Sequence, residues 1–193
     1  LAGDTGHYDG VIEAFESRGL EVRPIFASGL DIRPAVERYF IEDGWPVVDA
    51  VVSLSGFSLV GGPAYCDPGA AEQMLADLDV PYISAQALEF QSLDQWRESS
   101  QGLLPIESTI MVALPELDGA TGSMVYGGRP SVGNAMSAEP ERVETLAGRV
   151  HKIISLRNKP RNARKIALVV FNFPPNAGAT GTAAHLDVFA SLY

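Results

Sequence analysis

Two acidic residues with one residue between them stand where an apolar run meets a series of glycines. Residues 110–114 carry no charge, and Pro115, Glu116, Leu117 and Asp118 follow. Because proline cannot donate to a ladder, we expect a buried strand at 110–114 that ends at Pro115. In open α/β sheets, ligands bind beyond the carboxyl ends of the strands. Glu116 and Asp118 are therefore candidates for metal binding, proton transfer or ligand binding.

The same acids also fit a plain reversal of the chain. Asp-Gly is a common turn pair, and Asp118-Gly119 would lead into a strand at 124–126. Spacing alone leaves both interpretations open.

The elements that would position these acids alternate between helix and strand along the first hundred residues. Helical spacing is found at 11–18, in a helix capped by Asp31, and after Asp67-Pro68, a favoured helix start. The predicted strands are 21–26, 47–54 and 80–84. This alternation predicts an α/β fold with a doubly wound parallel sheet of the Rossmann or flavodoxin kind.

We expect three parts along the chain. Residues 1–100 form the α/β domain, and residues 101–140 form a connecting segment with the strand, the acidic glycine-rich turn and a flexible loop at 131–140. Residues 141–193 supply a long helix, a strand at 166–171 and a helix from residue 182, which begin a second α/β unit.

Charge is distributed unevenly along the chain. Residues 1–141 hold 22 acids and 6 Lys or Arg, a balance of -16, whereas residues 142–193 hold 2 acids and 8 Lys or Arg, a balance of +6. This distribution argues against nucleic acid as a partner. No run of roughly 18 apolar residues occurs, so we expect no membrane span and a cytoplasmic protein.

Glycine-rich segments and one histidine complete the candidates. Residues 56–63 place Phe57 and Leu59 among glycines, which suits a flat apolar ligand, although the apolar side chains could equally pack inward. Residues 3–10 lack the Lys-Ser/Thr pair of a phosphate-binding loop. His7 is a candidate ligand or proton carrier, and a structural role is the alternative.

Four segments resemble one family. They are Thr5-Gly6-His7-Tyr8, residues 56–63 (Gly-Phe-Ser-Leu-Val-Gly-Gly-Pro), residues 114–119 (Leu-Pro-Glu-Leu-Asp-Gly) and residues 171–176 (Phe-Asn-Phe-Pro-Pro-Asn). In this order they resemble the large, porphyrin-binding subunit of magnesium chelatase. The large subunit of cobaltochelatase is a related family.

The resemblance implies a function. A magnesium chelatase inserts Mg²⁺ into protoporphyrin IX at the expense of ATP, in chlorophyll and bacteriochlorophyll biosynthesis. ATP is used by an AAA+ ATPase subunit and its companion subunit. The family's subunit is several times longer than this chain, which begins at Leu1 without Met, so the resemblance implies a fragment that is inactive alone.

The resemblance also assigns roles. Mg²⁺ prefers oxygen ligands, and its insertion displaces two pyrrole protons. Glu116 is expected to bind the ion and receive protons, with Asp118 as a second ligand or orienting group, Glu107 as a third candidate and His7 assisting proton removal. The residues expected to contact the porphyrin are Phe57, Leu59, Gly61 and Gly62. The alternatives are a cobaltochelatase-type subunit and a non-catalytic small-molecule-binding or docking module.

Overall fold

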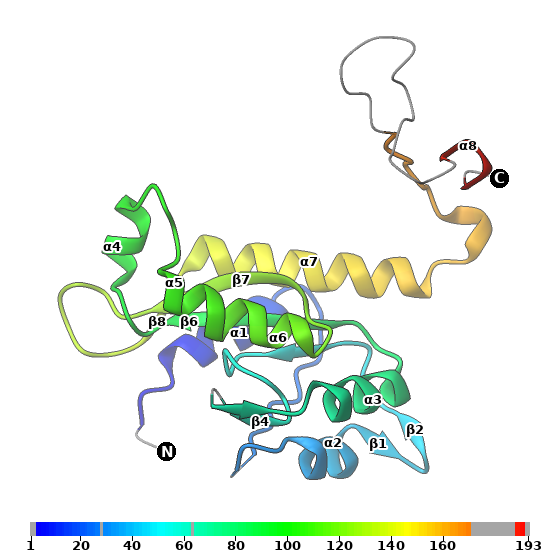
Figure 1. Ribbon diagram of the computed structural model, residues 1–193, viewed down its shortest axis with the longest axis horizontal. Coiled ribbons are helices and arrows are strands. Elements are labelled where there is room, and N and C mark those ends of the chain that lie inside the picture. Colours follow the sequence, from blue (N-terminus) through cyan, green and yellow to red (C-terminus); the bar gives the residue numbers. More distant parts are fainter. Residues whose placement is uncertain (1–2, 28, 63, 171–187, 192–193) are drawn as a thin grey trace. The chain divides into compact units, whose positions relative to one another are not determined.

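The computed structural model describes residues 3–27, 29–62, 64–170 and 188–191. Leu1–Asn158 forms one compact unit and Lys159–Tyr193 a second (Figure 1). The sequence placed divisions near residues 100 and 140. In the structure, strands from both sides of residue 100 pair in one sheet of the first unit.

The central sheet is mixed. Its order is β3-β6-β7-β8, with β3 (Val51–Ser53), β6 (Tyr82–Leu88), β7 (Thr121–Gly128) and β8 (Ser137–Ala138). The pairs β3–β6 and β6–β7 are parallel, as the sequence predicts, whereas β8 runs antiparallel to β7. Two small hairpins pair β1 (Ile41–Glu42) with β2 (Trp45–Pro46) and β4 (Gly61–Gly62) with β5 (Tyr65–Cys66). The α/β class is confirmed.

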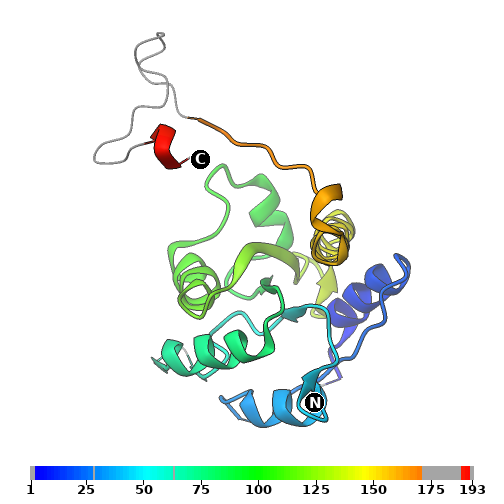
Figure 2. The ribbon, with the colours of Figure 1, turned by 90° about the vertical axis from the view of Figure 1, so that its right-hand side faces the viewer.

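Helices cover both faces of the sheet (Figure 2). α1 (Gly6–Glu16) and α7 (Pro140–Asn158) lie on one side, and α3 (Pro68–Leu78) lies on the other. The remaining helices of the unit include α2 (Arg33–Tyr39) and α4 (Leu93–Glu98). The predicted start of α3 is confirmed, since Asp67 Oδ1 accepts a hydrogen bond from the backbone N–H of Ala70 at 3.0 Å.

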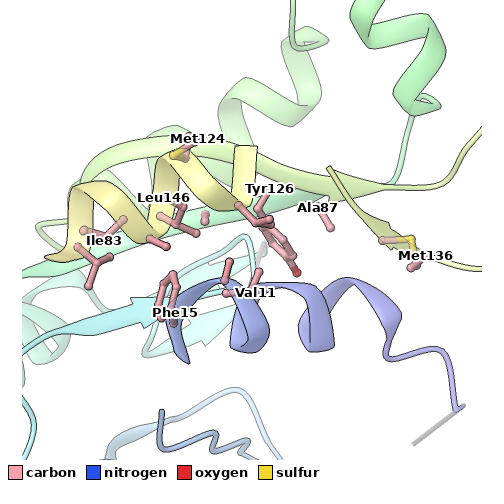
Figure 3. Packing of buried hydrophobic residues seen from close by; sticks show 13 residues of the cluster. Val11, Phe15, Ile83, Ala87, Met124, Tyr126, Met136 and Leu146 are labelled. Carbon is pink, nitrogen blue, oxygen red and sulfur yellow. The ribbon is translucent and has the colours of Figure 1, made fainter. Parts of the chain in front are cut away.

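The main core lies between the sheet and the α1–α7 pair (Figure 3). Every residue of β6 is buried, and Ile83, Ala85 and Ala87 face this core. Because strand side chains alternate between faces, Ser84 and Gln86 point to the opposite face. That second face is polar at its centre, which is unusual for a buried strand.

The predicted strand at 110–114 is wrong, because residues 105–117 are helical throughout. α5 (Pro105–Glu107) continues into a π-helix, η1 (Ser108–Ala113), and then into α6 (Leu114–Leu117). Glu107, Met111 and Pro115 are buried at a spacing of four, which makes a helical stripe. The ring of Pro115 would clash with a carbonyl of a regular α-helix one turn earlier, and the wider π-turn precedes it. We call these residues the 105–117 segment.

Other expectations also changed. Residues 21–26 form no strand, and Val22 and Ile25 of this stretch pack on the cores instead. The strand expected at 47–54 shortens to β3, and the loop expected at 131–140 contains β8. In the second unit, η2 (Arg161–Ala163) and α8 (Val188–Ser191) are helical, and residues 166–170 form no strand. Phe171 and residues 182–187 of the predicted strand and helix lie outside the described residues.

The contact between α1 and β8 provides a test of packing. An added Cβ on Gly10 would lie 2.5 Å from Ala138 Cβ, whereas one on Gly148 of α7 meets the Arg18 side chain at no less than 3.7 Å. Gly10→Ala gains helix propensity of about 1 kcal/mol, but overpacking costs roughly 1–3 kcal/mol. We expect urea unfolding to show a net loss of about 1 kcal/mol for Gly10→Ala, and a gain of up to about 1 kcal/mol for the control Gly148→Ala. Equal gains in both variants would show that α1 and β8 are not in close contact.

Candidate functional site

The carboxyl ends of β3, β6 and β7 lie at the same edge of the sheet, because these three strands are parallel. The segments that follow them carry the glycine loop at 54–62, Gln91 and Arg129. Ligand sites of open α/β sheets form at this edge. The sequence candidates reach it from two sides, with the 105–117 segment on one face and α1 on the other.

Asp118 fastens the glycine loop to the end of the 105–117 segment. Its side chain is 1% exposed. Oδ2 accepts a hydrogen bond from the backbone N–H of Leu59 at 2.7 Å, and Oδ1 accepts one from the hydroxyl of Ser58 at 3.1 Å. The Ser58 oxygen in turn accepts from the backbone N–H of Val60 at 3.2 Å. Two segments separated by about 60 residues in the sequence are thereby joined through one carboxylate.

The carboxylate of Asp118 is buried and bonded to the glycine loop. Burial raises the pKa of Asp118, and the hydrogen bonds from Leu59 and Ser58 act in the opposite direction. Each carboxylate oxygen accepts one hydrogen bond from the loop. The orienting role is the one that this geometry supports.

Glu116 and Asp118 have different surroundings. It is exposed on α6, beside Leu117, whose side chain is 63% exposed. Glu116 thus faces solvent, whereas the Asp118 carboxylate is buried against the glycine loop. Among the described residues, no group of three or more His, Cys, Asp or Glu is arranged to hold a metal ion.

The candidate porphyrin contacts divide into exposed and buried positions. Phe57 is half-buried, whereas Leu59 is 3% exposed and packs in the core with Val60. The inward-packing alternative thus describes the Leu59 side chain. A Cβ on Gly61 would lie 2.3 Å from the Tyr65 carbonyl oxygen, and one on Gly62 would lie 3.0 Å from Leu30. Gly61 is therefore needed for hairpin packing, whereas at Gly62 the Leu30 side chain would have to shift.

His7 lies in the first turn of α1 rather than in a loop. It is 5% exposed, and its ring stacks on Tyr126 with centroids 6.0 Å apart. Figure 3 shows Tyr126 directed from β7 towards α1. His7 Nδ1 and the Tyr126 hydroxyl are both buried without a hydrogen-bond partner among the described residues. Burial lowers the pKa of His7, although the nearby Asp4 carboxylate opposes this effect.

The lowered pKa predicts a pH dependence. Below pH 6.5 an unfolded His7 gains a proton that the folded, buried ring resists, so folding stability should fall as the pH drops from 6.5 towards the lower folded pKa. His7→Gln should flatten this part of a urea-midpoint profile, whereas His151→Gln, at an exposed position on α7, should leave the wild-type profile in place. Identical profiles for wild type and His7→Gln would contradict the burial of a neutral His7.

Sequence reasoning ranked Glu107 only third among the acids and missed its surroundings. Glu107 is fully buried, and its Oε2 accepts hydrogen bonds from Gln91 Nε2 and from the backbone N–H of Leu104, the latter at 2.9 Å. Glu107 Oε1, Gln86 Oε1 and Ser84 Oγ are buried without a partner among the described residues. A four-residue period from Glu107 onwards was the available signal, but the strand-like apolar run obscured it.

One shallow hollow lies elsewhere. It measures about 270 Å³ and is lined by Ile83, Thr121, Gly122, Arg149, Lys152 and Ile153. These residues belong to β6, the start of β7, and α7, so the hollow is on the face opposite the 105–117 segment. Among the described helices, none is both long and apolar enough to cross a membrane.

The fold and this edge define an α/β domain with a fixed glycine loop at the carboxyl ends of its parallel strands. The sequence model of the family described as CobN/Magnesium Chelatase matches residues 1–193. The chain belongs to this family.

Individual relatives show how much of the whole protein the chain represents. A magnesium-chelatase subunit of Cereibacter sphaeroides is 49% identical over 211 residues, covering 100% of this chain and 18% of that protein. The chloroplastic magnesium-chelatase subunit ChlH of Oryza sativa subsp. indica is 46% identical over 195 residues, covering 100% and 14%. The aerobic cobaltochelatase subunit CobN of Sinorhizobium sp is 27% identical over 198 residues, covering 96% and 15%. The chain thus spans less than a fifth of the length of these relatives.

Proposed function

We propose that this chain is part of the porphyrin-binding subunit of a magnesium chelatase, which inserts Mg²⁺ into protoporphyrin IX in chlorophyll or bacteriochlorophyll biosynthesis. The observation that carries the proposal is the contrast in identity along the whole chain. Identity is 46% and 49% to two magnesium-chelatase subunits but 27% to the cobaltochelatase subunit.

The glycine loop supports a flat ligand at the carboxyl edge. Asp118 fixes the backbone at Ser58 and Leu59, and Met111 lies 3.5 Å from the place a Cβ on Gly56 would occupy. A loop held from two sides is pre-organised, which reduces the entropy lost on binding. Phe57 and the backbone of Gly61 and Gly62 are the proposed contacts, and Leu59 supports the loop from the core.

The chemistry requires oxygen ligands for Mg²⁺ and acceptors for two pyrrole protons. Glu116 is the proposed acceptor, because its carboxylate is exposed just before the residue that fastens the loop. Asp118 orients this turn through its bonds to the loop. His7 is the proposed proton carrier on the other face of the sheet, and its unpaired Nδ1 is consistent with that role.

The remaining assignments follow from the family. Mg²⁺ is a substrate ion. We propose that ATP is used by an AAA+ ATPase subunit acting with a companion subunit, and that the complex works in the cytoplasm. This chain represents a small share of the large subunit, so functional tests require the complete subunit.

A fluorescence-quench titration of the complete subunit with a soluble porphyrin tests the proposal. We expect saturable quenching without Mg²⁺ or ATP. Phe57→Ala should weaken the porphyrin affinity, whereas Phe26→Ala, which truncates a phenylalanine that is 73% exposed in a segment outside the glycine loop, should not. Absence of saturable quenching in a folded subunit would overturn the proposed function.

A further inference from the structure

The face of β6 opposite the main core carries a layer of buried oxygen atoms under the 105–117 segment. Ser84 and Gln86 point to this face, and Ser53 lies beside Ser84 in the parallel register. The exposed fractions of Ser84 and Gln86 are 0% and 1%. Ser84 Oγ and Gln86 Oε1 have no hydrogen-bond partner among the described residues. A buried polar atom without a partner costs roughly 1–3 kcal/mol, so such atoms call for a missing partner.

Glu107 belongs to the helical segment that packs against this face. It lies one turn before Met111 on the inward stripe, and Met111 and Gln86 both lie within 4 Å of the place a Cβ on Gly56 would occupy. Its Oε2 is held by Gln91, three residues beyond the end of β6, so the carboxylate lies near the carboxyl end of that strand. Its Oε1 is buried and unpaired within the described part of the chain.

Glu107 also has no cationic partner among the described residues. The ion pairs of the described residues do not include Glu107, and its protein partners are an amide and a backbone N–H. A buried carboxylate without a cation is unfavourable. Oxygen atoms from a carboxylate, an amide and a hydroxyl are the ligands that a hard divalent cation prefers, and Mg²⁺ typically keeps several waters around one or two carboxylates.

We infer that Glu107, Gln86 and Ser84 form a site for hydrated Mg²⁺ at the carboxyl edge of the sheet, beneath the 105–117 segment. The inference rests on the proposed function, because it names a place where the substrate ion is held. It assigns ion binding to Glu107 and leaves Glu116 to act at the porphyrin. The π-helix η1 covers this site, and π-turns within helices are frequent at functional sites.

Thermal unfolding of the complete subunit with MgCl₂ alone, without porphyrin, ATP or partner subunits, tests the site. An ion that binds the folded state raises the midpoint in a concentration-dependent manner. We expect this rise in wild type and in the control Glu72→Gln, which changes an exposed glutamate of α3. Glu107→Gln should abolish the rise, and Gln86→Met should shift it to at least about tenfold higher Mg²⁺.

Two results would overturn the inference. One is no Mg²⁺-dependent rise in wild type, and the other is an unchanged rise in both folded site variants. If Glu107→Gln does not fold, Gln86→Met alone decides between these outcomes. The porphyrin titration is made without Mg²⁺, so a subunit that binds porphyrin but shows no rise contradicts this site and leaves the proposed function standing.

Discussion

Asp118→Ala should lower the free energy of unfolding by roughly 1–3 kcal/mol, because it removes the carboxylate that accepts from two buried donors and leaves one of them unpaired. These donors are the backbone N–H of Leu59 and the hydroxyl of Ser58, and the hydroxyl can still donate to the carbonyl of Val60 at 3.2 Å. The glycine loop would lose its link to the 105–117 segment. Urea unfolding of the 193-residue chain measures the loss, and hydrogen exchange at Leu59 should increase with it.

Asp49→Ala is the matched control for this prediction. Asp49 is exposed, so its removal should change the stability by no more than about 0.5 kcal/mol. A loss for Asp118→Ala that is no larger than the loss for Asp49→Ala would mean that the carboxylate does not hold the loop. Asp118→Asn should fall between the two, since the amide oxygen can still accept from Leu59.

Glu116→Gln should reduce Mg²⁺ insertion by the reconstituted enzyme by about 10²–10⁴-fold, the usual contribution of a group that accepts a proton in the reaction. The side chain is exposed in this unit, so the stability of the chain should stay within about 0.5 kcal/mol of wild type. Substitution of Asp118 should thus lower the stability, whereas substitution of Glu116 should lower the turnover.

Glu98→Gln, an exposed glutamate at the end of α4, controls for loss of surface charge and should leave insertion unchanged. Porphyrin quenching by Glu116→Gln should match wild type, because the glycine loop and its Asp118 link remain. Wild-type insertion by Glu116→Gln would remove Glu116 from the chemistry and reduce its segment to a turn.

Sequence patterns predicted the elements whose signals are local. α3 begins where Asp67 and Pro68 predict, and α7 buries the apolar stripe of Val143, Leu146 and Val150. The strands β6 and β7 also lie where short apolar runs indicated them. The two helices have a cap or a clear helical period, so neighbouring structure did not need to decide their type.

The 105–117 segment shows where such reasoning fails. Residues 110–114 are an uncharged run of five, and a run of this length does not distinguish a buried strand from a buried helix. Pro115 was expected to end a strand, yet it sits at the start of α6 behind a π-helix. The decisive contacts are with β6 and with the glycine loop, and these are distant in sequence.

Sequence reasoning named Asp118 and Glu107 but not the contacts that surround them. The 114–119 motif does contain a residue that organises the carboxyl edge, namely Asp118. Its bonds to Ser58 and Leu59 join two of the family motifs, and no spacing rule connects residues so far apart. Asp118 is buried, whereas Glu116 is exposed. Glu107 is also buried, and the apolar run that follows it in the sequence hid the helical period that would have indicated this.

Metal insertion by the complete subunit with its ATPase and companion subunits tests the central claim most directly. Protoporphyrin IX would be supplied with Mg²⁺ or Co²⁺ in parallel reactions, and the metalloporphyrin products followed by their absorption. The account predicts ATP-dependent formation of magnesium protoporphyrin. ATP-dependent insertion of Co²⁺ without insertion of Mg²⁺ would contradict it and place the chain with the cobaltochelatase branch of the family.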